Sequence, residues 1–209
     1  MSRIILSDAE ASRPSSSWPR PRRIRGAHDG WRARHLGPPG DPDDVQLYVL
    51  ESAWREARDH SLTDLHREVG GILVGGYYID DHGDRPLRFV EVEGFVPCLE
   101  GQSGAGNFKF THDSWSALRK LKEERFGDDL LMLGWHHTHP GIGLFLSGLD
   151  QFIQRNFFPE PWMPALVVDP RAQEFEFFRM RDGRVEKWSF HLLTPARRNG
   201  ESPSGVQRG

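Results

Sequence analysis

Cysteine is nearly absent from this sequence, and long apolar runs are missing altogether. Its 209 residues include one cysteine, Cys98, which excludes an internal disulfide and any zinc site built from several thiolates. No run of about 18 apolar residues occurs, so we expect no membrane-spanning helix. The apolar stretch at residues 4–6 is too short for the core of a secretory signal. A single cysteine also fits a reducing compartment, and we expect a cytoplasmic protein.

An excess of positive charge is missing from the chain as a whole. Lys and Arg number 27 against 30 Asp and Glu, a net charge of −3, which excludes the overall basic character of proteins that coat nucleic acid. Hydrophobic residues make up 37% and aromatic residues 11%, enough to bury a sizeable core. At about 100–200 residues per domain, the length allows one domain with tails or two very small domains.

The first part of the chain differs in kind from the rest. Residues 1–44 are rich in proline and serine and show no apolar periodicity, which predicts a disordered extension. Residues 13–35 contain seven arginines opposed by one aspartate, so an acidic partner or nucleic acid is a candidate partner of this arm. Trp18 and Trp31 are unusual for a solvated tail and could pack onto the domain. Residues 194–209 are again rich in Gly, Ser and Arg and predict a flexible C-terminal tail.

Between these tails, residues 45–193 combine strand and helix patterns. Strands are predicted at residues 45–50, 68–79, 87–96, 130–136, 165–168, 174–181 and 185–192. Helices are predicted at residues 51–66, 111–126 and 147–157. Asp182 and Gly183 form a hairpin signal between the last two strand patterns. The fold class is therefore α/β (α+β) with several antiparallel pairings, and we expect a chain that lacks residues 1–44 to fold.

The chemically informative stretch is residues 135–150. His137 and His139 lie two positions apart at the end of an apolar strand, where the period of two puts both imidazoles on one face. Ser147 is a good N-cap for the next helix, so Asp150, in the first turn of that helix, could reach the same metal ion. Two imidazoles and one carboxylate form the three-ligand pattern of catalytic zinc, which leaves a fourth position for water.

A water at such a site needs a base, and Glu68 is the candidate. It opens an otherwise apolar, glycine-rich strand, where a carboxylate is out of place unless it points into a site. Plainer interpretations remain for each residue: polar strand-end histidines, Ser147 as a helix cap only, Asp150 as a partner of the helix dipole, Glu68 as a surface charge. His136 should face away from His137 and is interpreted as a core or supporting residue.

Together these residues resemble the JAMM (MPN+, JAB-domain) metalloprotease family. The motif is a Glu before a Gly-Ile-Leu strand, then His-x-His-Pro, six residues, and Ser-x-x-Asp, and this sequence shows no departure from it. The resemblance covers about residues 45–193, which we interpret as the JAB/MPN domain. It implies the JAB/MPN fold, a curved mixed β-sheet flanked by helices, similar to the fold of cytidine deaminases. A deaminase itself is excluded because no Pro-Cys-x-x-Cys motif is present.

The resemblance also implies the residue roles. His137, His139 and Asp150 would bind one Zn²⁺ per chain, as in a zinc metallopeptidase. Glu68 would take the proton from the attacking water and pass it to the leaving amine. Ser147 would hydrogen-bond the developing oxyanion. The implied reaction is that of a JAMM-type isopeptidase: hydrolysis of the amide bond after the Gly-Gly C-terminus of a ubiquitin-like or sulfur-carrier β-grasp protein.

The short run at residues 150–165 leaves little room for an insertion, so the chain resembles a minimal, prokaryotic-type member of the family. The loop after the histidines could form, with Trp162, a slot for an extended glycine-ended tail. The candidate substrate-binding residues are Gly141, Gly143, Phe145 and Trp162. Two alternatives remain open: a non-catalytic MPN scaffold, and a nucleic-acid-associated hydrolase that uses the basic arm.

Overall fold

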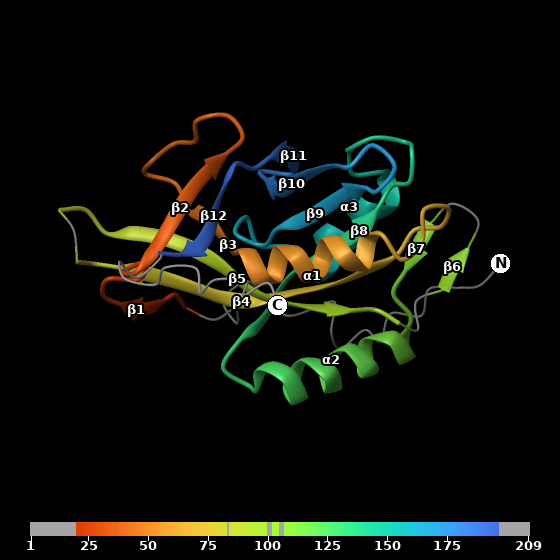
Figure 1. The fold of residues 1–209 in the computed structure, drawn as a ribbon, viewed down its shortest axis with the longest axis horizontal. Coiled ribbons are helices and arrows are strands. Elements are labelled where there is room, and N and C mark those ends of the chain that lie inside the picture. The colour runs from red at the N-terminus through yellow and green to blue at the C-terminus, as the bar shows by residue number, and fades with distance from the viewer. Residues whose placement is uncertain (1–19, 83, 100–101, 105–106, 197–209) are drawn as a thin grey trace, which may run out of the picture.

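A single mixed β-sheet forms the centre of the computed structural model, which describes residues 20–82, 84–99, 102–104 and 107–196 (Figure 1). Its strands run in the order β11-β10-β9-β8-β4-β5-β3-β12-β2, and β1 pairs with β4. The strand bounds are β1 Arg22–Ile24, β2 Trp31–Leu36, β3 Gln46–Leu50, β4 Gly70–Asp80, β5 Leu87–Pro97, β8 Leu131–Thr138, β9 Ala165–Asp169, β10 Glu174–Arg181, β11 Arg184–Lys187 and β12 Phe190–Pro195. A separate two-stranded sheet joins β6 (Gln102–Gly104) to β7 (Asn107–Lys109).

The helices of the described residues cover the sheet from both sides. They are α1 Glu51–Ser61, α2 His112–Phe126 and α3 Gly148–Phe157. Neighbouring residues of β5 point to opposite faces: the Phe95 ring lies 5.6 Å from the His60 ring of α1, whereas Gly94 faces Phe126 of α2. Figure 1 shows the same arrangement, with α1 and α2 on either side of β4 and β5. The predicted α+β class with helices flanking a mixed sheet is confirmed.

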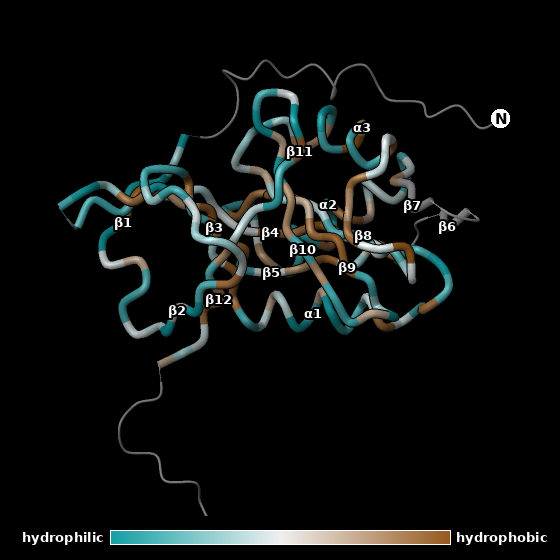
Figure 2. The backbone as a smooth tube through the Cα atoms, turned by 90° about the horizontal axis from the view of Figure 1, so that it is seen from above, coloured by the Kyte–Doolittle hydropathy of each residue, from teal (hydrophilic) through white to brown (hydrophobic). Residues whose placement is uncertain are grey.

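The sheet curls because its central strand is irregular. The pairing of β4 shifts register against β5 between Val74 and Gly75, and against β8 between Leu73 and Val74. Such bulges bend a strand and increase its twist. Glycine is required at residue 75, because a Cβ there would overlap the carbonyl oxygen of Glu91. Hydrophobic residues concentrate in β4, β8 and β9, whereas β1 and β2 are mostly hydrophilic (Figure 2).

The hairpin at Asp182 and Gly183 forms as predicted, since both residues have positive φ (49° and 73°) and join β10 to β11. The single strand predicted at residues 185–192 is wrong. The chain leaves β10 after Trp188, and β12 then pairs in parallel with β3 and antiparallel with β2. Trp188 is buried at this break, so the apolar pattern continues through it and conceals the change of partner.

The disorder predicted for residues 1–44 is wrong for residues 20–44, and residues 1–19 lie outside the described part of the chain. β1 pairs with β4, and β2 pairs along its whole length with β12, from Trp31 opposite Pro195 to Leu36 opposite Phe190. β2 is an edge strand with mostly exposed side chains, so it carries no apolar pattern that sequence reasoning could detect. The strands of the sheet therefore begin before the expected domain boundary at residue 45. At the other end, β12 extends to Pro195, and residues 197–209 are not described.

The segment before β3 also covers part of the core. A small cluster of Tyr48, Phe89 and Leu193 packs against Ile24 and neighbouring side chains. The His28 ring lies 4.0 Å from the Tyr48 ring and 4.9 Å from the Phe89 ring. Its Nε2 lies 2.9 Å from the carboxylate of Glu91. Residues 20–44 are thus part of the folded unit. No helix of the described residues is long and apolar enough to cross a membrane.

These contacts predict that a chain beginning at residue 45 is destabilised. Uncovering Phe89 and its neighbours should cost about 3 kcal/mol, which at 2–4 °C per kcal/mol corresponds to a melting temperature lower by roughly 10 °C. A chain beginning at residue 20 is the matched control, because it keeps every described contact. Thermal unfolding followed by circular dichroism measures both. Equal melting temperatures for the two chains would contradict the assignment of β1 and β2 to the folded unit.

Candidate metal centre

The candidate centre lies at the C-terminal end of β8. This strand is paired on both sides, and His137 lies opposite Gly70 of β4 and Val167 of β9. His139 follows the last residue of the strand, and its backbone N–H donates to the carbonyl of Val168 at 2.8 Å. Both imidazoles are buried on the same face, with ring centroids 4.7 Å apart, as the two-residue spacing predicts.

A carboxylate reaches these rings from the first turn of α3. Ser147 is the N-cap: its Oγ accepts the N–H of Asp150 at 3.3 Å, and the Asp150 carboxylate accepts the N–H of Ser147 at 2.7 Å. This reciprocal capping box fixes the Asp150 side chain over the helix start. The predicted cap role of Ser147 is confirmed, and the same cap aims Asp150 at the histidines.

The donor atoms have the spacing of ligands around one ion. His137 Nε2 lies 3.1 Å from His139 Nε2. Asp150 Oδ1 is 3.4 Å from His137 Nε2, and Oδ2 is 3.5 Å from His139 Nε2. Ligands bonded at 2.0–2.1 Å in a tetrahedron are about 3.3 Å apart. The three side chains therefore fit a shared metal ion without rearrangement, and each offers one ligand atom within 4.8 Å of the others.

The charges of these groups are balanced against each other. Burial lowers the pKa of His139, but hydrogen bonding and the charge of Asp150 raise it by more, so the net shift is upward. Burial raises the pKa of Asp150, but hydrogen bonds from His137 and His139 lower it by more, so the net shift is strongly downward. The Asp150 carboxylate is therefore ionised. Its negative charge favours a positive charge nearby, either on the histidines or on a divalent cation.

His136 lies on the other face of β8, as predicted. Its Nε2 is 2.8 Å from Ser61 Oγ of α1, and it is completely buried. Burial moves the pKa of His136 well below its usual value, so the ring is neutral. His136 is a core residue rather than a ligand.

Glu68 stands beside the three candidate ligands. It is 8% exposed, and its Oε1 lies 4.0 Å from His139 Nε2. The next residue, Val69, forms two hydrogen bonds with Thr138. Val69 N–H donates to Thr138 Oγ1, and Thr138 N–H donates to the Val69 carbonyl, each at 2.9 Å. The start of β4 is thus tied to the segment between the histidines, which brings the carboxylate of Glu68 to the site.

The expected slot residues divide into two groups. Gly141 and Gly143 have φ of 78° and 90°, a conformation that favours glycine, and lie in the loop after His139. The Phe145 ring is 43% exposed and lies 4.7 Å from the His139 ring. These three residues lie in the loop that follows His139, and Gly143 and Phe145 contact its ring.

The prediction that Trp162 lines the same slot is wrong. It is 7% exposed and stacks on Tyr77 of β4, with ring centroids 5.0 Å apart. Tyr77 is seven residues along β4 from Gly70, the partner of His137, which corresponds to roughly 23 Å at the usual rise per residue. Trp162 is a core residue at the far end of the strand, because a large apolar ring is most stable when buried.

Asp169 supports the site, a role that the residue pattern alone does not predict. This buried carboxylate accepts backbone N–H groups from Gly141 at 3.0 Å, Gly143 at 3.4 Å, Arg171 at 3.0 Å and Ala172 at 3.1 Å. The carbonyl of Gly143 in turn lies 3.1 Å from His139 Nδ1. A hydrogen bond at Nδ1 turns Nε2 toward the site, as in many metal-binding histidines. Burial raises the pKa of Asp169, but the four amides lower it by more, so the carboxylate is ionised.

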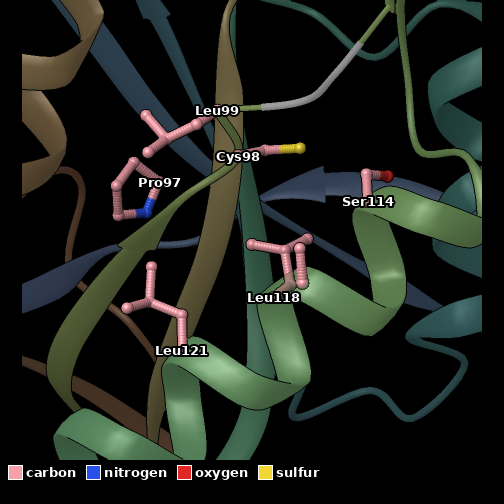
Figure 3. A pocket seen from close by; sticks show the side chains of 7 residues that line it. Pro97, Cys98, Leu99, Ser114, Leu118 and Leu121 are labelled. Atoms are coloured by element: carbon pink, nitrogen blue, oxygen red, sulfur yellow. The ribbon is translucent and has the colours of Figure 1, made fainter.

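Cys98 is a packed, buried thiol. It lines a small pocket between the end of β5 and α2, together with Pro97, Leu99, Ser114, Leu118 and Leu121 (Figure 3). Its backbone N–H bonds to Gly70, the residue opposite His137, so Cys98 lies about two strand spacings, ~10 Å, from the candidate ligands. The cysteine is therefore not part of the ligand set.

Several known proteins are similar to this chain in sequence. No family model matches the chain. The 26S proteasome regulatory subunit RPN11 of Eremothecium gossypii is 28% identical over 160 residues, which are 76% of this chain and 46% of that protein. The COP9 signalosome complex subunit 5 of Caenorhabditis elegans is 49% identical over 127 residues, 60% of this chain and 32% of that protein. Both relatives are members of the JAMM (MPN+) family.

The chain is similar in sequence to these JAMM proteins. It spans less than half the length of these curated relatives. The solution structure of protein DSY2949 from Desulfitobacterium hafniense has the same fold, with a TM-score of 0.51 and 20% identity over 70% of this chain and 92% of that chain. JAMM proteins are zinc-dependent, and the buried group of His137, His139 and Asp150 is suited to that ion.

The geometry predicts about one zinc ion per purified chain. Replacing both histidines (His137→Ala with His139→Ala) should remove the metal, because one carboxylate cannot hold it alone. His112→Ala, an exposed residue at the start of α2, is the matched control and should retain it. Elemental analysis by plasma mass spectrometry measures the content. Stoichiometric zinc in the double variant would rule out this ligand set.

Proposed function

We propose that the chain is a zinc metallopeptidase of the isopeptidase type. It would hydrolyse the amide bond after the Gly-Gly C-terminus of a ubiquitin-like or sulfur-carrier β-grasp protein. The observation that carries the proposal is the complete set of groups at one point: two imidazoles and one carboxylate spaced for a single ion, with Glu68 beside them. Its relative in Saccharomyces cerevisiae, 29% identical over 126 residues, is named ubiquitin carboxyl-terminal hydrolase RPN11, which supports the substrate class.

The metal, when bound by His137, His139 and Asp150, supplies an activated water and polarises the substrate carbonyl. Glu68 is the group that moves protons. Its carboxylate accepts a proton from the attacking water and delivers it to the leaving amine nitrogen. The contact with His139 and the pairing of Val69 with Thr138 keep Glu68 close to the ligands without making it one of them.

Ser147 is the proposed donor to the developing oxyanion. It lies three residues before Asp150, at the start of α3, so its hydroxyl stands next to the metal ligands. The helix cap uses Oγ as an acceptor, which is compatible with donation of the hydroxyl hydrogen to a substrate oxygen. A single donor of this kind is worth about 10²–10³ in rate.

Gly141, Gly143 and Phe145 are the proposed contacts for the tail of the substrate. The two glycines present backbone without side chains, and Phe145 adds an exposed ring next to His139. A glycine-ended tail could lie close to such a surface, whereas a larger side chain would collide with it. Specificity would then arise by exclusion.

The alternatives are less well supported. A non-catalytic MPN scaffold would have no need for a complete ligand set with an adjacent carboxylate. The proposed acidic partner or nucleic acid at residues 13–35 stays a prediction. Within that segment, Arg22 bonds to the carbonyl of Asp129 at 3.2 Å and Arg23 pairs with Asp81 at 3.0 Å. Two of its arginines therefore already have partners within the chain.

The role of Glu68 predicts that Glu68→Gln keeps zinc and loses turnover. An amide of the same size cannot accept the proton, so kcat should fall by roughly 10²–10⁴-fold. Glu124→Gln, an exposed change on α2, is the control and should leave kcat unchanged. Cleavage of a fluorogenic ubiquitin-like substrate and zinc analysis on the same sample measure both properties. Full activity of Glu68→Gln would refute the assigned proton transfer.

The proposed slot predicts a strict requirement for glycine in the substrate. A β-grasp protein joined through its Gly-Gly end to a lysine side chain should be cleaved, and its counterpart with Val as the last residue should not. The branched side chain would not fit between Phe145 and the glycine loop. Product formation from the two substrates is measured by mass spectrometry. Equal cleavage of both substrates would indicate a general peptidase.

A further inference from the structure

We infer that Arg171 is a positioning residue that holds Glu68 at its working distance from the metal ligands. The inference rests on the proposed role of Glu68 and assigns Arg171 no contact with substrate. Arg171 lies in the turn after β9, far from Glu68 in sequence. Its side chain nevertheless bonds to the loop that delivers Glu68 to the site.

That loop, residues 62–67, connects α1 to β4. Leu62 and Leu65 are 49% and 41% exposed, so apolar packing fixes it only weakly. Asp64 accepts the N–H groups of His66 and Arg67 at 2.8 and 2.9 Å, which shapes the turn locally. A local turn does not determine where the loop lies relative to β8.

Arg171 supplies that missing link. Its Nε donates to the carbonyl of Leu65 at 2.7 Å, and its Nη2 lies 2.9 Å from His66 Nδ1. These acceptors precede Glu68 by three and two residues. On the other side of Glu68, Val69 is held by Thr138. The chain is therefore held on both sides of Glu68, and only the N-terminal side depends on Arg171.

The same turn also supports the metal ligands. The backbone N–H of Arg171 donates to Asp169, whose carboxylate holds the Gly141 and Gly143 amides and, through Gly143, the ring of His139. The Arg171 side chain lies over Gly141, since a Cβ there would be 3.2 Å from its Cδ. The turn after β9 thus contacts both the loop after His139 and the loop at residues 62–67. It therefore sets the distance between these two loops.

Arginine is the residue type that this bridge requires. Its planar guanidinium presents several N–H donors in a fixed fork, so one side chain reaches the Leu65 carbonyl and the His66 ring together. A lysine could reach one of these acceptors at a time. A methionine has no N–H donor and could bond to neither acceptor.

Arg171→Met is the test, with Arg171→Lys as the conservative variant and the exposed hairpin change Arg184→Met as control. We expect zinc content, melting temperature and KM to stay at their original values in Arg171→Met, while kcat falls by about 10²-fold, the size of effect that a small misplacement causes. Arg171→Lys should recover part of that loss. Arg184→Met should have full activity.

Two further readouts separate positioning from a general structural effect. Arg171→Met in the Glu68→Gln background should cause little further loss, because both changes act through one carboxylate. Amide hydrogen exchange at residues 62–68 should be faster in Arg171→Met than in the unchanged chain and in Arg184→Met. An equal loss of kcat in both backgrounds, or unchanged exchange at residues 62–68, would overturn the inference.

The exchange measurement needs no substrate, so it also distinguishes the two failures. If the zinc-loaded chain cleaves no ubiquitin-like substrate, the proposed function fails. Faster exchange at residues 62–68 would then still support Arg171 as the anchor of the loop. If cleavage is normal and exchange is unchanged, the positioning role fails alone.

Discussion

The central physical constraint is the burial of two imidazoles and one carboxylate at a single point. Isolated charged or polar groups are costly in the interior unless they are paired or bind a metal. Here Asp150 compensates both His137 and His139 at 3.4 and 3.5 Å, and the three donor atoms are spaced for one ion. The members compensate one another through the Nε2 atoms and the carboxylate, and that arrangement is also suited to a divalent cation.

Several independent elements must meet for this cluster to form. β8 is paired with β4 and β9, which fixes the strand that carries His137. The capping box of Ser147 fixes Asp150 at the start of α3. Asp169 fixes the loop after His139 by accepting its amides. Each element acts over short distances, so the precision of the site comes from their combination rather than from any one of them.

The sequence predicts the parts of the site that obey local rules. The two-residue spacing of His137 and His139 puts them on one face, and the Ser147 cap places Asp150 one turn into the helix. Asp169 and Arg171 are not predicted because they act mainly on loop backbone groups, which no side-chain pattern records. Trp162 misleads because a tryptophan after a short helix could serve either a slot or the core.

The same physical distinction applies to the fold. The central strands have apolar patterns and are predicted well. β2 is held by backbone pairing to β12 and exposes most of its side chains, so its sequence resembles that of a tail. The break between β11 and β12 is hidden because Trp188 continues the apolar run. Sequence patterns report burial, and they fail where a strand pairs without being buried, or where a buried residue lies at a change of strand partner.

X-ray absorption spectroscopy at the zinc edge of the purified chain tests the central claim most directly. The account predicts nitrogen and oxygen ligands at about 2.0–2.1 Å, with outer-shell scattering from two imidazoles. His139→Ala should lower the imidazole contribution to one or release the metal. A sulfur ligand at about 2.3 Å, or a zinc ion with no imidazole ligand, would contradict the account.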